Sequence, residues 1–324
     1  MKTAFLFPGQ GAQVVGMGAD IVHSFDKAAE IFKQANDIVG FDLSGICFEG
    51  PAEELNSTAV SQPAIFTTSA AILEVLKTES KTSSLQADVT AGLSLGEYTA
   101  LYAAGVLSFE EALVLVQKRG RAMQEAAEAE GGSMVSIIGL DEDKVHQLCE
   151  EVISSEEEDE DEEESGEQFL EPVNFNCPGQ IVISGTKAAC KQAKELAVKY
   201  GAIKAVRLDV AGAFHTRMMA AAAEALGQAL SQSRIAEPSQ TKIIANINAE
   251  YYSGSDAIKE GLIKQLTNPI LWQKCMERLL ADGVEDFYEI GPGRVLTGLM
   301  KRISRKTKVI NISSAQSLNE ILKR

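Results

Sequence analysis

A serine between two glycines, in Gly92-Leu93-Ser94-Leu95-Gly96, constrains the fold of this chain more than any other feature. The G-x-S-x-G pattern presents a nucleophilic serine at a sharp turn between a strand and a helix. Small residues are needed there because the tight backbone leaves no room for a Cβ atom. Residues 88–91 can form the entering strand, and residues 97–104 the following helix, which Gly105 ends. The pattern therefore predicts a strand–turn–helix unit that exposes the hydroxyl of Ser94.

Short apolar segments alternate with amphipathic helical patterns on both sides of this motif. Such alternation is typical of an α/β domain with a mostly parallel sheet. We expect a large, hydrolase-like α/β domain formed by residues 1–130 and 209–324. Its expected strands are 3–7, 88–91, 242–246 and 284–290, and its main expected helices are 20–39, 62–76, 109–129, 218–230, 258–266 and 269–281.

Residues 131–208 have a different pattern and are expected to form an inserted subdomain. Strands are expected at 133–139, 169–176, 180–184 and 202–208, and helices at 141–152 and 186–200. The order strand–helix–strand–strand–helix–strand is that of a small ferredoxin-like α+β unit. The turn Cys177-Pro178-Gly179 favours a hairpin between the two middle strands.

A run of nine consecutive acidic residues, 156–164, interrupts this subdomain. It contributes much of the net charge of −16, and removing nine negative charges leaves −7. Like charges in such a run repel one another and cannot be buried, so we expect a solvated, disordered loop at about 154–168 without a catalytic role. Either net charge argues against nonspecific nucleic-acid binding.

The five cysteines are widely spaced, odd in number and without a C-x-x-C pair. This argues against a disulfide framework or a zinc site and favours reduced, buried thiols. No apolar run approaches the roughly 18 residues needed to span a bilayer, so no membrane insertion is expected. Residues 1–7 form too short an apolar stretch for a signal peptide. We expect a cytoplasmic monomer, with a removed organellar targeting peptide as the alternative.

A serine hydroxyl needs a base before it can attack a carbonyl at neutral pH, and the chain has three histidines. His23 and His146 lie in polar helical segments and are expected at the surface. His215 follows a strand within a small, apolar segment, where it can face a cleft. No acid stands out as its partner: Asp209 is one option, and a backbone carbonyl that holds Nδ1–H is another. We favour a dyad of Ser94 and His215.

Six separated motifs resemble those of the malonyl-CoA:acyl-carrier-protein transacylase family of type II fatty acid synthesis. The resemblance extends over nearly the whole chain. The motifs are FPGQGAQ at 7–13, GLSLGEY at 92–98, KRG at 118–120, GAFH at 212–215, QLTNP at 265–269 and GPGRVL at 291–296.

The resemblance implies an acyltransferase that passes malonyl from malonyl-CoA to the phosphopantetheine thiol of acyl carrier protein for fatty acid biosynthesis. It implies Ser94 as the acylated nucleophile and His215 as its base. The backbone N–H groups of Gln10 and Leu95 would form the oxyanion hole. No metal or other cofactor is expected. A discrete polyketide acyltransferase, a serine hydrolase or thioesterase, and an inactive scaffold are alternatives.

The resemblance also implies how the substrate is bound. Arg119 would bind the malonyl carboxylate, for which a bidentate guanidinium is well suited, and Gln265 would help to position base and substrate. Leu93, Phe214 and Asn268 are expected in the substrate pocket. The family usually has histidine where this chain has Leu93, which changes any hydrogen bond made near the acyl group. Phe214 matches the members that accept malonyl.

A basic segment follows the GPG motif and is the expected docking site for an acidic carrier protein. It contains Lys301 and Arg302, followed by Arg305, Lys306 and Lys308. Because the whole chain is acidic, a local cationic patch would be needed to overcome long-range repulsion.

Overall fold

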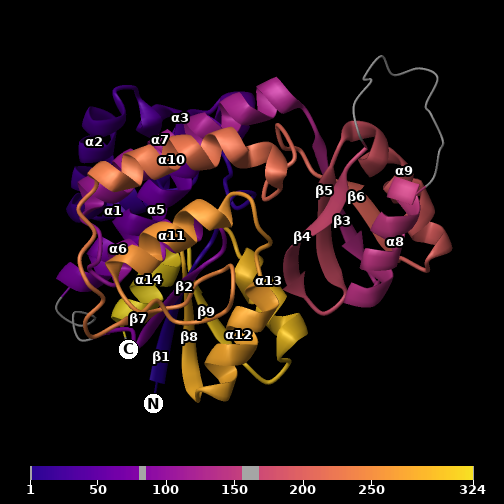
Figure 1. Cartoon of the computed structure of the whole chain (residues 1–324). Helices are drawn as coiled ribbons and strands as arrows, with labels where there is room; N and C mark the ends of the chain where they lie inside the picture. The colour runs from indigo at the N-terminus through magenta and orange to yellow at the C-terminus, as the bar shows by residue number, and fades with distance from the viewer. Residues whose placement is uncertain (1, 80–84, 155–167, 324) are drawn as a thin grey trace.

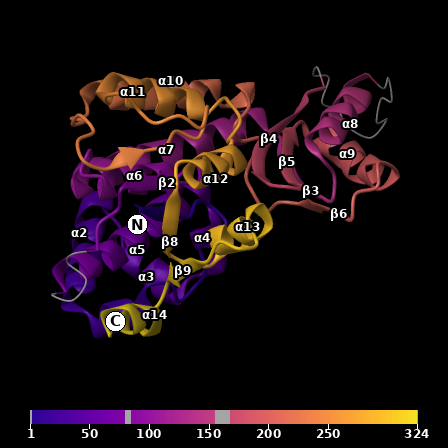
Figure 2. The ribbon, with the colours of Figure 1, turned by 90° about the horizontal axis from the view of Figure 1, so that it is seen from below.

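The computed structural model describes residues 2–79, 85–154 and 168–323, which form a mixed α/β structure with two sheets (Figure 1). The acidic run at 156–164, and most of the loop expected at 154–168, lie outside the described residues. The larger sheet and its helices form the bulk of the molecule, and the smaller sheet lies at one end (Figures 1 and 2).

The larger sheet is parallel between all its paired strands, which confirms the expected mostly parallel sheet. Its order is β7-β2-β1-β8-β9. The strands are β1 (Lys2–Phe7), β2 (Val89–Gly92), β7 (Lys242–Ile243), β8 (Val284–Ile290) and β9 (Val309–Ile312). Phe5 and Phe7 of β1 belong to one core cluster, and Ala4 and Leu6 to another. Side chains alternate between the two faces of a strand, so both faces of this sheet are buried.

Helices cover both faces of this sheet. One face packs against α2, α5, α6, α7, α10 and α11, and the other against α12 and α13. The helices of this part of the chain are α1 (Ala19–Ser24), α2 (Asp26–Val39), α3 (Leu43–Glu49), α4 (Ala52–Asn56), α5 (Thr58–Thr78), α6 (Gly96–Ala103), α7 (Phe109–Glu130), α10 (Ala220–Gln232), α11 (Ser255–Gln265), α12 (Trp272–Ala281), α13 (Val295–Ile303) and α14 (Ala315–Leu322). A short 3₁₀ turn, η1 (Arg217–Met219), precedes α10.

Several of these helices differ from the sequence expectation: α11 begins three residues earlier and α12 three residues later than expected, and two larger differences lie near the N-terminus. The single helix expected over 20–39 is divided into α1 and α2, because Phe25 has an extended backbone (φ −139°, ψ 114°) and packs against the core. Helix α5 begins at Thr58 rather than at residue 62. Among the described helices, α5 alone is long and apolar enough to cross a membrane, but 83% of its apolar window is buried. Helix α5 is therefore buried in the way that is typical of a core helix.

The smaller sheet has the order β4-β5-β3-β6 and is antiparallel throughout. Its elements are β3 (Ser133–Ile138), α8 (Glu142–Ser154), β4 (Leu170–Cys177), β5 (Gln180–Gly185), α9 (Lys187–Lys199) and β6 (Lys204–Arg207). Cys177 pairs with Gln180, as the expected hairpin requires. This is the ferredoxin-like arrangement. All of these elements lie within 131–208, and the domain boundaries themselves stay a prediction.

Backbone hydrogen bonds join the edge strand β4 of the smaller sheet to the segment before α12. Ile270, just before α12, donates to the carbonyl of Val173 (2.7 Å) and accepts from the N–H of Phe175 (2.9 Å). Strand β4 is therefore fixed against the larger unit.

Candidate active site

The expected turn around Ser94 is confirmed. Strand β2 ends at Gly92, α6 begins at Gly96, and Ser94 between them has a left-handed backbone (φ 51°). A Cβ on Gly92 would lie 1.9 Å from the backbone of Gly96, and one on Gly96 would lie 2.2 Å from the carbonyl oxygen of Phe7. No side chain fits at either distance. The glycines therefore let the turn close, and the strained serine is held at the tip.

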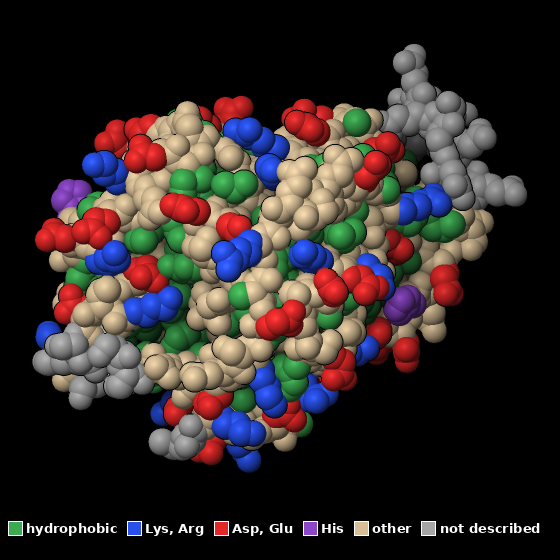
Figure 3. Space-filling view, turned by 60° about the vertical axis from the view of Figure 1, so that its left-hand side comes forward, with side chains coloured by type: hydrophobic (Ala, Val, Ile, Leu, Met, Phe, Trp, Pro, Cys, Tyr) green, Lys and Arg blue, Asp and Glu red, His purple; other side chains and the backbone are tan. Residues whose placement is uncertain are grey.

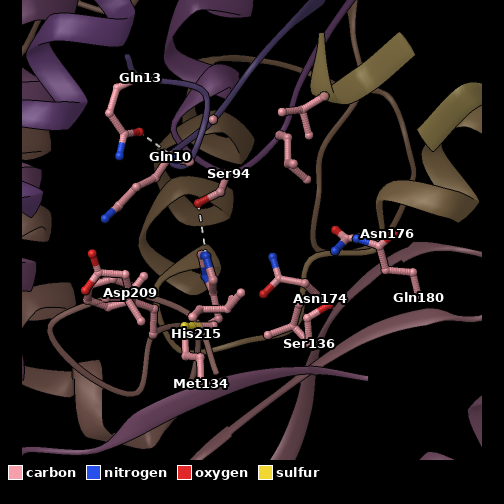
Figure 4. Close-up of a pocket in the computed structure, with 18 of the residues that line it drawn as sticks. Gln10, Gln13, Ser94, Met134, Ser136, Asn174, Asn176, Gln180, Asp209 and His215 are labelled. Atoms are coloured by element: carbon pink, nitrogen blue, oxygen red, sulfur yellow. Dashed lines mark hydrogen bonds between the residues drawn. The ribbon is translucent and has the colours of Figure 1, made fainter. Parts of the chain in front are cut away.

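Ser94 and His215 form a hydrogen-bonded pair, with 3.0 Å between Oγ and Nε2 (Figure 4). His215 also has a left-handed backbone (φ 63°), in the segment between β6 and η1. Its Nδ1 lies 2.8 Å from the backbone carbonyl oxygen of Gln265. A carbonyl can only accept, so Nδ1 carries the proton and Nε2 is free to accept one from Ser94. Asp209 is exposed in the same pocket, and Gln265 has the position that an acid would otherwise take.

Burial keeps the base neutral. It lowers the pKa of His215 to about 4, and the positive charge of Arg119 lowers it further. The hydrogen bond to the carbonyl of Gln265 acts in the opposite direction and raises the pKa. The imidazole is therefore unprotonated at neutral pH and able to act as a base. The other two histidines, His23 and His146, are exposed, as expected.

Arg119 is a fully buried cation beside the nucleophile. Its Nη2 donates to Ser94 Oγ and to Gln265 Oε1, each at 3.0 Å, and its Nη1 donates to Gln62 Oε1 at 2.7 Å. Among the described residues its Nε has no partner. Its hydrogen-bond partners in this part of the chain are hydroxyl and amide groups rather than carboxylates. Burial lowers its pKa from a very high ordinary value, so it stays charged.

A buried carboxylate lies behind this centre, at Glu97. Glu97 accepts hydrogen bonds from Gln265 Nε2 (2.8 Å), from the backbone N–H of Asn246 (3.2 Å) and from the hydroxyl of Tyr252. Burial raises its pKa to about 7, although these three donors and Arg119 act in the opposite direction. Gln265 thus contacts Ser94, His215, Arg119 and Glu97 together.

Sequence reasoning missed Gln62, Glu97, Asn246 and Tyr252. Asn246 holds the turn from behind, since its Oδ1 accepts from the N–H of Ser94 (2.7 Å) and its Nδ2 donates to the carbonyl of Gly92 (2.8 Å). Glu97 follows the G-x-S-x-G motif directly and could have been noticed as an acid at a buried helix start. The other three have no local sequence signal.

The two expected oxyanion-hole residues lie next to the serine. Gln10 lines the pocket, and Leu95 is buried at the start of α6. Within the described residues, the backbone N–H groups of Gln10 and Leu95 have no hydrogen-bond partner, while the Gln10 side chain donates to Thr58 Oγ1 (3.3 Å). Their role in holding an oxyanion stays a prediction.

A cavity of about 490 Å³ opens in front of Ser94 and His215, and it is lined by the smaller sheet and by the segments that follow β1 and β2 of the larger sheet. Leu93 and Phe214 line it, as expected. Asn268 differs from the expectation: it is exposed, and its amide donates to the carbonyl of Lys264 (2.8 Å) at the end of α11 rather than lining the cavity.

Side-chain amides form much of the cavity wall, and sequence reasoning missed them as a group. They are Gln10, Gln13, Asn56, Asn174, Asn176 and Gln180 (Figure 4). Asn174 and Asn176 are two apart on β4, the spacing that places both on one face of a strand. Within the described residues, the Oδ1 atoms of both are buried without a partner. Each oxygen becomes an acceptor for a bound ligand once its side chain turns into the cavity.

The basic segment expected to dock a carrier lies beside the cavity, since Val295 and Leu299 of α13 line it. Arg302 is engaged there: it donates to Gln180 Oε1 (3.1 Å) and to the carbonyls of Pro178 and Gly179 (3.3 Å each). Lys301, Arg305, Lys306 and Lys308 are exposed. Elsewhere, one face of the molecule carries acidic and basic side chains intermixed (Figure 3).

The acyl transferase domain family matches residues 4–322. The chain belongs to this family. A relative from Bacillus subtilis named malonyl CoA-acyl carrier protein transacylase is 42% identical to this acyl transferase, over 98% of this chain and 95% of the relative. The solved malonyl CoA-acyl carrier protein transacylase of Coxiella burnetii superposes with a TM-score of 0.91 at 34% identity, covering 100% and 98% of the two chains.

A further solved structure contains a carrier protein. It is a malonyl-transacylase in complex with a type II polyketide synthase acyl-carrier protein, and its chain matches this acyl transferase with a TM-score of 0.91 at 37% identity. The match covers 100% of this chain and 99% of the other. The α/β fold with its two sheets is therefore that of the malonyl transacylases.

Proposed function

We propose that this acyl transferase moves a malonyl group from malonyl-CoA to the phosphopantetheine thiol of an acyl carrier protein, through a malonyl ester on Ser94. The observation that carries the proposal is Arg119, a buried guanidinium whose Nη2 lies 3.0 Å from Ser94 Oγ. A cation at this position suits an acyl group that ends in a carboxylate. The names of the relatives agree with this chemistry.

The first half-reaction forms the ester. Ser94 Oγ attacks the thioester carbonyl while its proton passes to His215 Nε2, and the Gln265 carbonyl holds the imidazolium that results. The negative oxygen of the tetrahedral intermediate is held by the N–H groups of Gln10 and Leu95. The carbon–sulfur bond then breaks, and the CoA sulfur leaves with the proton from His215.

The second half-reaction reverses these roles. The carrier thiol gives its proton to His215 and attacks the ester carbonyl, after which Ser94 Oγ leaves and takes the proton back. Each step moves an acyl group or a proton, so we propose that no cofactor is needed. Arg119 holds the malonyl carboxylate through both halves.

The amide-lined wall suits the pantetheine arm, which CoA and acyl carrier protein have in common. That arm contains two amide groups, each with an N–H donor, and the unpartnered Oδ1 atoms of Asn174 and Asn176 are acceptors. Contacts of this kind would serve both half-reactions, because CoA and the carrier protein present the same pantetheine arm.

The carrier protein itself belongs either to fatty acid synthesis or to a polyketide pathway. The resemblance of the motifs to the transacylases of type II fatty acid synthesis favours the first, and the solved complex with a polyketide synthase carrier favours the second. Comparing malonyl transfer to one carrier of each class, at equal concentrations, separates the two. Docking at Lys301 and the cations that follow it, the monomeric state and a cytoplasmic location stay predictions.

Intact-mass measurement tests the function. Incubation with malonyl-CoA should add one malonyl group to the chain, and added holo-carrier protein should remove it and gain the same mass. Rapid loss of the adduct to water without a carrier would favour a hydrolase instead. Absence of any adduct would contradict the proposal.

A further inference from the structure

Arg119 and Glu97 are two buried, opposite charges that do not touch. Arg119 is 1% exposed and Glu97 is 0% exposed. Both contact the amide of Gln265, which accepts from Arg119 with Oε1 (3.0 Å) and donates to Glu97 with Nε2 (2.8 Å). A buried charge is costly unless an opposite charge lies near it. The charges of Arg119 and Glu97 therefore offset each other only until a further charged group, such as a substrate carboxylate, enters the site.

Glu97 is also the carboxylate that acts electrostatically on Arg119. The other titratable groups packed around Glu97 are Tyr98 on α6, Tyr252 before α11 and Cys275 on α12. Burial raises the pKa of all three well above its ordinary value, so these groups stay neutral at working pH. Arg119 is then the charged group that faces Glu97 in this part of the chain.

We propose that Glu97 is the resident counter-charge of Arg119 and that it weakens the hold of Arg119 on the substrate carboxylate. The inference rests on the proposed function, in which that carboxylate belongs to malonyl. When the malonyl carboxylate binds, it and Glu97 share the one buried positive charge of Arg119, and Glu97 repels the bound carboxylate. Weaker retention lets the malonyl group leave for the carrier thiol.

The same arrangement couples malonyl binding to a proton. A second anion beside Arg119 makes protonation of Glu97 more favourable, and the coupling is reciprocal, so protonation of Glu97 tightens malonyl binding. Because burial raises the pKa of Glu97 to about 7, the change falls within the pH range of an assay. The hydroxyl of Tyr252, which donates to Glu97, can turn to accept from the protonated acid.

Glu97→Gln removes the charge and can keep the contacts. The new carbonyl oxygen can accept from Gln265 and Asn246, while the new amide N–H faces the Tyr252 hydroxyl, which is able to accept. Glu289 gives a matched control. It is also 0% exposed, but it accepts from the backbone N–H groups of Leu296 and Thr297 at the start of α13.

Binding is measured by calorimetry in a Ser94→Ala background, where no ester can form, with malonyl-CoA and acetyl-CoA at pH 8 and pH 6. Glu97→Gln should tighten malonyl-CoA binding at pH 8 by about three- to tenfold and leave acetyl-CoA binding unchanged. The background protein should bind malonyl-CoA more tightly at pH 6 than at pH 8, and Glu97→Gln should abolish this difference. Glu289→Gln should keep it.

Equal changes for both ligands, or weaker malonyl-CoA binding, would overturn the proposal and leave Glu97 a merely structural residue. If Glu97→Gln fails to fold, Tyr252→Phe replaces it. Loss of the hydroxyl donor raises the pKa of Glu97, so the gain in malonyl affinity should begin at a higher pH. An unchanged dependence of malonyl-CoA affinity on pH would contradict the proposal. Failure of the proposed function would be seen separately, as the absence of a malonyl adduct on Ser94 in the unaltered chain.

Discussion

The Nδ1 atom of His215 lies 2.8 Å from the backbone carbonyl oxygen of Gln265, so a peptide group rather than an acid orients the candidate base. A carbonyl fixes the tautomer as firmly as a carboxylate does, but it brings no full negative charge. The imidazole therefore stays weakly basic in its buried position, and its protonation depends strongly on the Arg119 guanidinium nearby.

This arrangement predicts how the reactivity of Ser94 depends on pH. Because the pKa of His215 is lowered to about 4, labelling of Ser94 by an uncharged fluorophosphonate should be nearly constant from pH 8 to pH 6 and fall only toward pH 4. Arg119→Ala removes the second cause of the lowered pKa and should move this fall to higher pH. A wild-type midpoint near 6.5, the ordinary histidine pKa, would show that burial does not lower the pKa of His215.

The same group affects folding. The unfolded chain binds the proton at the ordinary histidine pKa of 6.5, and the folded chain does so only near 4. Stability from the neutral, buried His215 is therefore complete above pH 6.5 and is lost as the pH falls toward 4. His215→Gln should flatten this part of the curve of unfolding free energy against pH, measured by urea titration.

Ser94→Ala should abolish the malonyl adduct, because the hydroxyl paired with His215 is lost. Intact mass after malonyl-CoA treatment should show one added malonyl group on the wild type and none on the variant. Ser136→Ala, in the same cavity on β3, is the matched control and should retain the adduct. An adduct of equal yield on Ser94→Ala would assign the nucleophile elsewhere.

Arg119→Ala should shift the preference of the enzyme from malonyl-CoA toward acetyl-CoA. Loss of a desolvated charged pair should cost malonyl transfer about 2–5 kcal/mol, whereas an acetyl group has no carboxylate to lose. The measurement is kcat/KM for both substrates with the same carrier. Equal losses for the two would mean that Arg119 serves the structure alone.

Asn174→Ala and Asn176→Ala should weaken the binding of every donor that carries a pantetheine arm. Each lost hydrogen bond is worth about 0.5–1.5 kcal/mol, so KM should rise several-fold for malonyl-CoA and for the carrier protein alike. The ratio of malonyl to acetyl transfer should stay the same. A change confined to that ratio would place these amides at the acyl group.

Carrier docking is best tested with variants that leave Arg302 unaltered. The guanidinium of Arg302 binds the β4–β5 turn, so its loss would disturb the cavity wall. The double variant Lys301→Glu and Arg305→Glu should raise the KM for carrier protein at low salt and leave acylation by malonyl-CoA nearly unchanged. Unaltered carrier kinetics at low salt would place the docking surface elsewhere.

The sequence predicts well those parts of the site that depend on local geometry. The turn at Ser94 follows from Gly92 and Gly96, because their close backbone approach excludes side chains. The hairpin at 177–180 follows from a similar local rule. Each of these features is determined by residues close together in the chain.

The rest depends on contacts between distant segments. Asn246 is 152 residues from Ser94, and Tyr252 is 155 residues from Glu97, so no local pattern connects them. Asn268 belongs to the same motif as Gln265, yet it points out of the site because its amide donates to the last turn of α11. Membership of a motif gives proximity in the chain, and only the packing of the helix decides which side chains face the cavity.

The late position of Gln265 has a consequence for the order in which the protein is made. A ribosome that has released the chain as far as His215 has already produced the nucleophile, its base and Arg119. The carbonyl that orients the base, and Ile270, which fixes β4 against the larger unit, are still to come. A chain that ends before Gln265 therefore contains Ser94 and His215 but lacks the carbonyl that orients the base.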